Sequence, residues 1–442
     1  MPTTQDFEYL LECRNVIGVD YDEREDKVRV FVSRKLPPET LDDEDDVEKR
    51  VHETAVDTTV DVVDAGYDED RNGYEPLSIL EPAPEAVEDR DDRHRPVPAG
   101  VSEINANSTA GTGGPYPARI ATETGDATEA VWSDAVDLGD FVRLSNNHVY
   151  ARSNEADFGE PILQPSPHDG GDRDDEVGEL VGYVPIADGV RVDVAARSVE
   201  RDRESASYYG LEEGWPTDVR RDGYDELRGE TVTKTGRTTG VTSASIEATS
   251  ASVTVEFGGE HGSVTLRDQL IAGHMSEGGD SGSPVFLEDG ELVGLLFAGS
   301  AEQTICNRIG NVERDLGVEI LAAEPDEDEG NDGGDERDAP VYTTTFEESL
   351  EVDLEGATLD LESITFEDRL RPGTRVAATV VVAASEPGSY WLEIAGERRT
   401  VDLEGDEDEA RDELRHAVDA AVDVPDDSSD TVGVTIAGGR VE

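Results

Sequence analysis

The stretch Gly278-Gly279-Asp280-Ser281-Gly282-Ser283-Pro284 is the most informative part of this sequence. It predicts a serine on a tight turn, because glycines on both sides allow a sharp bend and leave the backbone N–H groups unobstructed. A serine hydroxyl is a weak nucleophile at neutral pH and needs an adjacent base and donors for a developing oxyanion. We expect the amides of Gly279 and Ser281 to be those donors. The alternative is a surface turn without chemistry.

Two apolar strands are predicted directly after this turn. The segment Ser283-Pro-Val-Phe-Leu is followed by the turn Glu288-Asp-Gly and then by Glu291-Leu-Val-Gly-Leu-Leu-Phe. Two apolar runs joined by a short Asp-Gly turn are typical of a β-hairpin. Such a hairpin would hold Ser281 rigidly.

A histidine and an acid precede the serine, in the order His148, Asp193, Ser281. The segment Phe141-Val-Arg-Leu-Ser-Asn-Asn-His predicts a strand that runs into a turn, and Asp193 interrupts the apolar run 190–197. A buried carboxylate is costly unless it is hydrogen-bonded, and an imidazole N–H is a natural partner. The order is that of a chymotrypsin-like triad. The alternatives are a structural turn histidine and an edge-strand acid that faces the solvent.

Acidic residues dominate the composition. The 442 residues contain 105 Asp and Glu against 37 Lys and Arg, a formal net charge of −68. Such a surface repels itself at low salt, whereas at molar salt the Debye length falls to about 3 Å. We therefore interpret the acidity as adaptation to a very salty solvent. A nucleic-acid mimic or a binder of basic partners is the alternative, although the charge is spread along the whole chain. Strong acidity argues against binding nucleic acid or an anionic membrane.

Cysteine content and the N-terminal sequence indicate the compartment. Two cysteines, Cys13 and Cys306, do not make a disulfide framework. The first residues lack the basic and apolar regions of a secretion signal, and no apolar run is long enough to span a membrane. We expect a cytoplasmic protein without cofactor or metal that acts on a peptide or protein substrate. Homo-oligomerisation is left open.

Residues near the predicted nucleophile offer a pocket for a substrate side chain. Met275 precedes Ser281 by six residues, and Phe297, Ala298 and Gly299 end the last long strand. Neither an acid nor a base is among them, so we expect a small or apolar substrate residue. A helix, 312–321, is expected to close the domain.

Two other loops have the composition of ligand sites. Gly111, Gly113 and Gly114 could cradle a phosphate, but the lysine of that motif and a following helix are missing, so a bulged strand is the better interpretation. The acidic loop 168–176 could bind a divalent cation through its oxygens, but its spacing is not that of a defined calcium loop. We expect a solvated loop there.

The motifs together resemble one group of enzymes, the intracellular, cysteine-poor trypsin-like proteases of microbes that are related to the plant narrow-leaf protein. The resemblance covers roughly residues 12–322 and rests on the order of the motifs. It implies a mainly β, double β-barrel fold, with His148 as general base, Asp193 as the residue that orients it and Ser281 as the nucleophile. The motifs are Phe31-Val-Ser-Arg-Lys-Leu-Pro-Pro, Arg95-Pro-Val-Pro-Ala-Gly, Thr109-Ala-Gly-Thr, Leu144-Ser-Asn-Asn-His-Val, Pro161-Ile-Leu-Gln-Pro, Asp193-Val-Ala, Lys234-Thr-Gly-Arg-Thr-Thr-Gly, Gly279-Asp-Ser-Gly-Ser and Gly294-Leu-Leu-Phe-Ala-Gly-Ser.

Composition and periodicity divide the chain into five predicted parts. In the last part we expect strands interrupted by one helix, 408–422. The parts are an N-terminal α/β module (1–67), a linker (68–95), a trypsin-like protease domain of two β-barrels (96–323), an acidic linker (324–340) and a β-rich accessory domain (341–442).

The predicted function is a serine endopeptidase that works through an acyl-enzyme and is adapted to high salt. One alternative is a peptide-binding scaffold that keeps the fold but not the turnover. Another is a self-cleaving protein whose only substrate is one of its own linkers, near 68–95 or 324–338.

Overall fold

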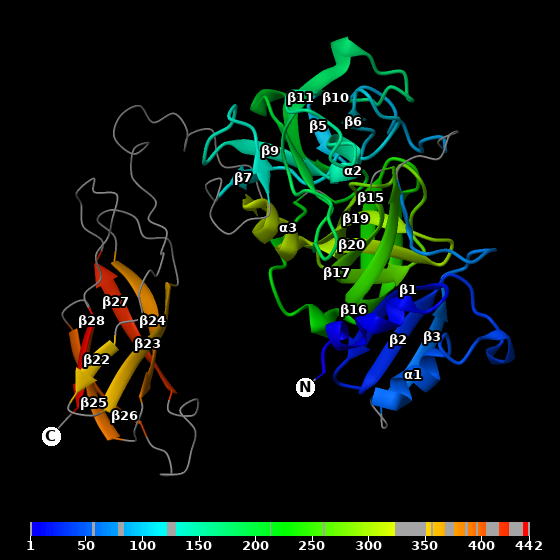
Figure 1. The fold of residues 1–442 in the computed structure, drawn as a ribbon. Coiled ribbons are helices and arrows are strands. Elements are labelled where there is room, and N and C mark those ends of the chain that lie inside the picture. Colours follow the sequence, from blue (N-terminus) through cyan, green and yellow to red (C-terminus); the bar gives the residue numbers. More distant parts are fainter. Residues whose placement is uncertain are drawn as a thin grey trace. The chain divides into compact units, whose positions relative to one another are not determined.

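The structure is a computed structural model, and the chain forms two compact units, Met1–Glu324 and Pro325–Glu442 (Figure 1). The first unit is mainly β, a double β-barrel of the chymotrypsin-like type preceded by a small α/β module, as the sequence predicts. The structure describes residues 2–54, 58–77, 84–121, 130–212, 214–259 and 261–322, together with the backbone of seven strands between 351 and 440.

The second barrel carries the predicted nucleophile and closes on itself. Its strands follow the order β15-β18-β19-β20-β17-β16, and a further pairing of β15 with β16 completes the ring. Apolar side chains such as Ile271 and Phe297 fill it and are fully buried. The strands are β15 (Thr231–Gly236), β16 (Gly240–Gly258), β17 (Gly262–Gly273), β18 (Pro284–Leu287), β19 (Glu291–Gly299) and β20 (Gln303–Arg308).

The first barrel carries the predicted base. Its sheet has the order β21-β7-β9-β12-β11-β10-β6, with β8 on β11. The short helix α2 (Asn147–Tyr150) follows β9 directly. The strands are β6 (Ile104–Asn105), β7 (Ala118–Ile120), β8 (Val131–Trp132), β9 (Phe141–Ser145), β10 (Pro161–Leu163), β11 (Glu176–Tyr183), β12 (Ala195–Ser198) and β21 (Val318–Ile320), and β5 (Val97–Ala99) pairs separately with β13 (Glu204–Tyr208).

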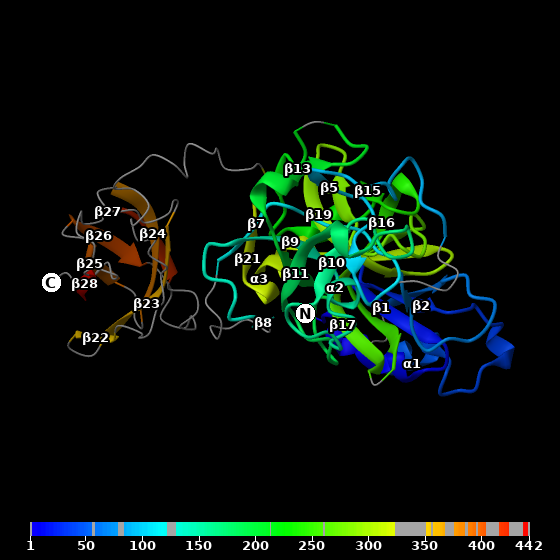
Figure 2. The ribbon, with the colours of Figure 1, turned by 90° about the horizontal axis from the view of Figure 1, so that it is seen from above.

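The closing helix is shorter than predicted. Helix α3 spans Ile309–Leu316 and ends at Gly317, which has a φ of +78°. A left-handed glycine at this position is a common helix terminator. The next residues form β21, which pairs with β7 of the first barrel, so the predicted helix 312–321 is wrong beyond Leu316. Figure 2 shows α3 beside β7 and β21.

The N-terminal module extends the sheet of the second barrel. Strand β1 pairs antiparallel with β16, opposite Val253, so β2 and β3 continue the same sheet (Figure 1). Two arginines of the barrel bind acids of the module: Arg228 contacts Asp20 at 2.6 Å, and Arg267 contacts Glu8 at 2.8 Å. The elements are η1 (Thr4–Glu12), β1 (Val16–Asp22), β2 (Lys27–Val32), η2 (Pro38–Thr40), α1 (Val47–Thr54) and β3 (Thr59–Asp64).

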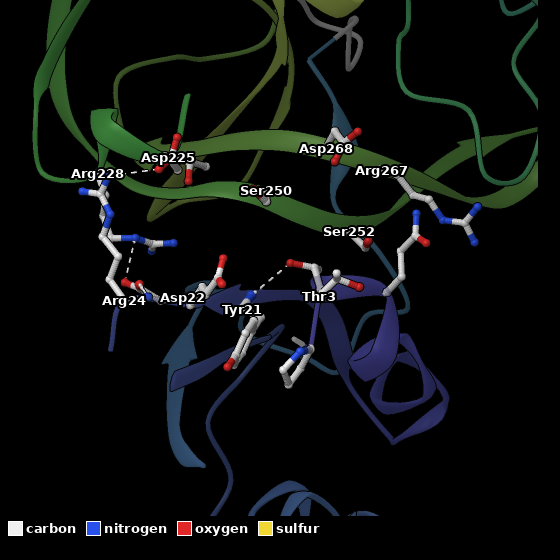
Figure 3. Close-up of a pocket in the computed structure, with 15 residues that line it drawn as sticks. Thr3, Tyr21, Asp22, Arg24, Asp225, Arg228, Ser250, Ser252, Arg267 and Asp268 are labelled. Atoms are coloured by element: carbon white, nitrogen blue, oxygen red, sulfur yellow. Dashed lines mark hydrogen bonds and ion pairs between the residues drawn. The ribbon is translucent and has the colours of Figure 1, made fainter. Parts of the chain in front are cut away.

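A groove of about 460 Å³ lies along this seam and is lined by charged and polar side chains from both sides (Figure 3). It contains none of the residues predicted to be catalytic. The arginine–carboxylate pairs beside it account for its charge, and we interpret it as part of the docking of the module.

Part of the predicted linker packs into the protease unit. Strand β4 (Glu75–Pro76) pairs with β19, and the side chain of Arg90 is fully buried. The remaining short elements are η3 (Arg173–Asp175), η4 (Arg201–Arg203), β14 (Asp218–Val219) and η5 (Tyr224–Leu227).

The second unit consists of two sheets, β22-β23-β24-β27 and β26-β25-β28. The helix predicted at 408–422 is wrong where the structure describes it, because Arg415–Asp423 forms β27, paired along its length with β24. Its alternating small apolar residues suit a strand as well as a helix. The predicted linker 324–340 lies outside the described residues. The strands are β22 (Glu351–Leu354), β23 (Ala357–Phe366), β24 (Arg375–Ala384), β25 (Gly388–Ile394), β26 (Glu397–Leu403), β27 (Arg415–Asp423) and β28 (Ile436–Arg440).

A fully buried ionic cluster lies inside the first barrel. Arg197 contacts Glu103 at 2.6 Å and Glu204 at 2.8 Å, and Arg143 contacts Glu204 at 2.8 Å. All four side chains are 0 % exposed. Burial alone would lower the pKa of Arg197, but the two carboxylates outweigh it and keep that pKa well above its ordinary value. Arg197 therefore stays charged and balances the carboxylates beside it.

Replacing Arg197 with methionine should destabilise the protein by about 3–5 kcal/mol, because it leaves two buried carboxylates without their main counter-charge. The matched control is Arg173→Met, since Arg173 is exposed in η3. Urea unfolding at molar KCl measures both variants. Equal stability of the two would contradict a structural role for the buried cluster.

Candidate active site

His148 lies on α2, immediately after β9, and is 4 % exposed. Its ring Nδ1 is 2.5 Å from Oδ2 of Asp193, and its backbone N–H donates to Oδ1 of the same carboxylate at 3.2 Å. Both oxygens of Asp193 are thus engaged by one residue. The contact fixes the orientation of the imidazole.

Asp193 is fully buried and lies just before β12, not within a strand as the sequence predicted. Its backbone N–H donates to Oδ1 of Asn307 at 3.1 Å. Its carbonyl accepts from Nδ2 of Asn146 at 2.9 Å and from Nδ2 of Asn307 at 3.1 Å. These bonds hold the backbone of the acid from both barrels. Asn307 was not singled out from sequence, because an asparagine within a strand carries no local motif.

Ser281 is fully buried in the turn between β17 and β18. Its hydroxyl donates to the carbonyl of Phe297 at 3.2 Å. Nε2 of His148 is buried and has no hydrogen-bond partner among the described residues. The structure therefore brings His148 and Asp193 into contact and records no hydrogen bond from Ser281 to the imidazole.

The serine turn nevertheless packs directly against the strand that leads to His148. Gly282 has a φ of +95°, and a Cβ there would lie 2.3 Å from Oγ of Ser145. Ser145 is the last residue of β9, three positions before His148. The Ser281 carbonyl also accepts from the N–H of Thr112, a residue of the first-barrel region, at 2.9 Å. The turn and the histidine thus belong to the same junction between the barrels.

Asp280 fixes the turn from inside. Its fully buried carboxylate accepts from the amide of Thr238 at 2.8 Å and from the hydroxyl of Thr239 at 2.7 Å. The Lys234 ammonium lies 3.3 Å away. Burial lowers the pKa of Lys234, and the Asp280 charge opposes that shift. The Lys-Thr-Gly-Arg-Thr-Thr-Gly motif therefore serves as a cradle for Asp280, a role that its sequence did not reveal.

The two predicted oxyanion donors differ in what they contact. Gly279, with a φ of +98°, donates its N–H to the carbonyl of Leu77 at 2.8 Å. A Cβ at Gly279 would lie 2.5 Å from Oγ1 of Thr238, so only glycine fits. The Ser281 amide has no backbone acceptor among the described residues.

The four predicted pocket residues belong to different surroundings, and Phe297 turns its ring away from Ser281. Its ring packs into the core of the second barrel with Ile271, whereas its carbonyl accepts from Ser281. Met275, 3 % exposed, packs with Val293 and Leu296. Ala298 is fully buried in the barrel core. Gly299 lies close to Leu77, since a Cβ there would be 3.3 Å from its Cδ1.

The two loops whose composition resembles that of a phosphate site or a cation site contact other residues of the protein. Gly111, Gly113 and Gly114 lie outside the named strands, but Thr112 between them forms an isolated antiparallel bridge with Ser102. In the acidic loop, Asp169 binds the guanidinium of Arg237, with Nε at 2.7 Å. Among the described residues, no group of three or more His, Cys, Asp or Glu could hold a metal ion. No described helix has the length and apolar character needed to cross a bilayer.

Glu160 anchors the chain that follows α2. It accepts from Nη2 of Arg152 at 2.7 Å, from Nδ2 of Asn107 at 2.9 Å and from the amide of Asp157 at 3.1 Å. Partial burial alone would raise the pKa of Glu160, but these hydrogen bonds outweigh it and lower the pKa from 4.5 to about 2. The unfolded chain therefore binds the proton first as the pH falls.

This shift predicts a pH-dependent contribution to stability. The Glu160 interactions should stabilise the fold fully above about pH 4.5 and be lost as the pH falls towards about 2. Glu160→Gln should be less stable than wild type by about 1 kcal/mol at neutral pH, because solvent screens this partly exposed group, and the difference should close in acid. Denaturant unfolding across this range checks it. A difference that does not change with pH would contradict the assignment.

Comparisons with known proteins find structural similarity only. No family model matches the chain, and no curated protein matches it. Among solved structures, a chymotrypsin of Cellulomonas bogoriensis is 15% identical, with 51% of this chain and 99% of that one covered and a TM-score of 0.35. A glutamic acid-specific serine protease is 18% identical, with 51% and 100% covered and a TM-score of 0.34. Protease A of Thermobifida fusca is 16% identical, with 51% and 98% covered and a TM-score of 0.33. The fold assignment rests on the strand pairings above.

Proposed function

We propose that this protein is a serine endopeptidase that hydrolyses peptide bonds through an acyl-enzyme. Ser281 attacks the peptide carbonyl and His148 Nε2 takes the hydroxyl proton, which it then gives to the leaving amine. Asp193 holds the proton on Nδ1 and stabilises the imidazolium. The amides of Gly279 and Ser281 bind the oxyanion. Water then hydrolyses the ester by the same base, which restores the serine.

The observation that supports this proposal best is the difference between the contacts of the two ring nitrogens of His148. Its Nδ1 is committed to Asp193, and its Nε2 is buried without a partner among the described residues. A buried polar nitrogen without a hydrogen bond is uncommon and needs an explanation, and a catalytic role is one such explanation. Nε2 is the nitrogen that a general base requires here.

Burst kinetics test the endopeptidase proposal. An activated ester and a fluorogenic peptide with leucine before the cut bond are given to the protein in molar KCl. We expect a burst of about one equivalent per folded chain, because the acyl-enzyme accumulates when deacylation is slow. Folded protein that produces neither a burst nor steady turnover would overturn the proposal.

A peptide-binding scaffold is the second candidate, and one observation favours it. The Ser281 hydroxyl is bonded to the Phe297 carbonyl and not to His148. If the protein is such a scaffold, peptides would bind in the same assay without being cut.

The finer resemblance, to the cysteine-poor proteases related to the plant narrow-leaf protein, rests on the ordered motifs and is part of the endopeptidase proposal.

A salty, reducing interior is the proposed setting. Cys13 and Cys306 are both buried and unpaired, which suits a reducing compartment, so we propose a cytoplasmic location. With a net charge of −68, self-repulsion should weaken the fold at low salt.

The thermal midpoint of unfolding should therefore rise steadily between about 0.1 M and about 1 M KCl, because the Debye length falls from about 10 Å to about 3 Å. NaCl at the same ionic strength should act equally, since screening depends on ionic strength. Calorimetry measures both series. A midpoint that is flat or falls with salt would contradict the adaptation.

A further inference from the structure

A short piece of the chain pairs with the last residues of β19, beyond those that pair with β18, beside the candidate active site. Strand β4 pairs antiparallel with β19, with Pro76 opposite Ala298 and Glu75 opposite Gly299. Addition of an extended peptide to a sheet edge is a common way for a protein to bind a peptide. Pro76 lacks an N–H, which an edge strand tolerates. This piece thus has the geometry of a bound peptide.

Leu77 makes the two backbone contacts that matter most for catalysis. Its N–H donates to the carbonyl of Phe297 at 3.0 Å. Its own carbonyl accepts from the amide of Gly279 at 2.8 Å, and Gly279 is a predicted oxyanion donor. A substrate presents the carbonyl of its scissile bond to such a donor. Leu77 is therefore placed like the residue that precedes a cut bond.

The side chain of Leu77 occupies the predicted pocket. It packs against the apolar cluster that contains Met275 and Leu296. A Cβ at Gly299 would be 3.3 Å from Cδ1 of Leu77, so the glycine leaves the leucine just enough room. Met275, Leu296 and Gly299 are all uncharged, which suits an aliphatic side chain.

The residues before Leu77 hold the piece in place. Tyr74 is fully buried, and its backbone exchanges hydrogen bonds with Thr254 at 2.8 Å and Glu256 at 2.9 Å. The hydroxyl of Tyr67 donates to the carbonyl of Gly299 at 3.1 Å. An anchored segment has a high local concentration at the cleft, as tethered ligands do.

We propose that residues 75–77 are an intramolecular ligand of the substrate cleft, and that the cleft selects peptides with leucine or a similar aliphatic residue before the cut bond. The inference builds on the proposed endopeptidase function, because it names that site's substrate class. It makes Leu77 a competitor of external peptides, so a peptide must displace Leu77 and its KM is raised. The hydrogen bond from Ser281 to the Phe297 carbonyl, which also accepts from Leu77, belongs to this resting state.

Peptide binding without catalysis tests the inference. The probe is fluorescently labelled Tyr-Glu-Pro-Leu-amide, titrated by anisotropy in molar KCl onto full-length Ser281→Ala with and without Leu77→Asp. We expect at least about tenfold tighter binding when Leu77→Asp is present, because the tethered competitor is removed. The matched control, Leu138→Asp, changes an exposed leucine (55 % exposed) and should bind as Ser281→Ala does. Equal binding with and without Leu77→Asp, or no binding to either, would overturn the inference.

A second variant and a second probe keep the test independent of folding problems. Leu77→Ala keeps the backbone bonds and removes most of the side chain, so its effect should lie between wild type and Leu77→Asp. A second probe, Tyr-Glu-Pro-Lys-amide, has lysine in place of the leucine. It should bind at least about tenfold more weakly than the leucine probe, because the lysine charge would be buried without a partner. Equal affinity for the two probes would overturn the stated preference.

The two proposals fail in different ways. If the leucine probe binds as expected and the wild-type sequence with Leu77→Asp hydrolyses no peptide, the inference stands and the endopeptidase proposal fails. If peptides are hydrolysed and Leu77→Asp changes neither KM nor probe binding, the endopeptidase proposal stands and the inference fails.

Discussion

Asp193→Asn is expected to lower kcat by about 10⁴-fold with little change in the fold. In the native protein, Oδ1 of Asp193 accepts from the backbone N–H of His148, and Oδ2 faces the ring Nδ1. In the variant the amide oxygen keeps the first bond, which turns the new NH₂ group towards Nδ1. Nδ1 must then accept, so the ring proton moves to Nε2. An imidazole in that form cannot take a proton from serine.

The matched control for this substitution is Asp188→Asn, at an exposed acid nearby in the chain. Both variants are compared with wild type for kcat on the fluorogenic leucine peptide and for near-ultraviolet circular dichroism. The control should retain wild-type kcat. A loss of less than about tenfold in folded Asp193→Asn would contradict the role given to the acid.

Ser281→Ala is expected to show the largest loss, about 10⁴-fold or more in kcat, because it removes the covalent pathway. The substitution removes one hydroxyl, which donates to the Phe297 carbonyl and to no other group among the described residues, so the fold should tolerate it. Ser243→Ala, on an exposed position of β16, is the matched control and should be as active as wild type. Retention of more than about a tenth of wild-type activity in Ser281→Ala would assign the chemistry to another group.

The sequence predicted the architecture of the first unit well, for identifiable reasons. The apolar runs on either side of Glu288-Asp-Gly became β18 and β19, because a hairpin signal is local. The strand that ends before His148 became β9, which the asparagine turn marks. The contact between His148 and Asp193 was also predicted, since a buried acid requires a donor.

What the sequence did not predict depends on contacts between distant segments. Asn307 and Lys234 act through partners in other elements, and no local spacing reveals that. Residues 75–77 lie in a stretch whose charge and prolines predict a linker, yet they pair with β19. The end of α3 was placed too late because the apolar pattern continues into β21, while the glycine that stops the helix is a single residue. For 415–423, alternating small residues fit both helix and strand.

Fluorophosphonate labelling in molar KCl tests the central claim most directly, because this reagent phosphonylates a serine only when a neighbouring base activates it. Labelled peptides are mapped by mass spectrometry in wild type, Leu77→Asp, His148→Ala and Ser281→Ala. We expect a label on Ser281 in wild type, faster labelling in Leu77→Asp, and no label in the other two variants. Folded Leu77→Asp that carries no label on Ser281 would contradict the central claim.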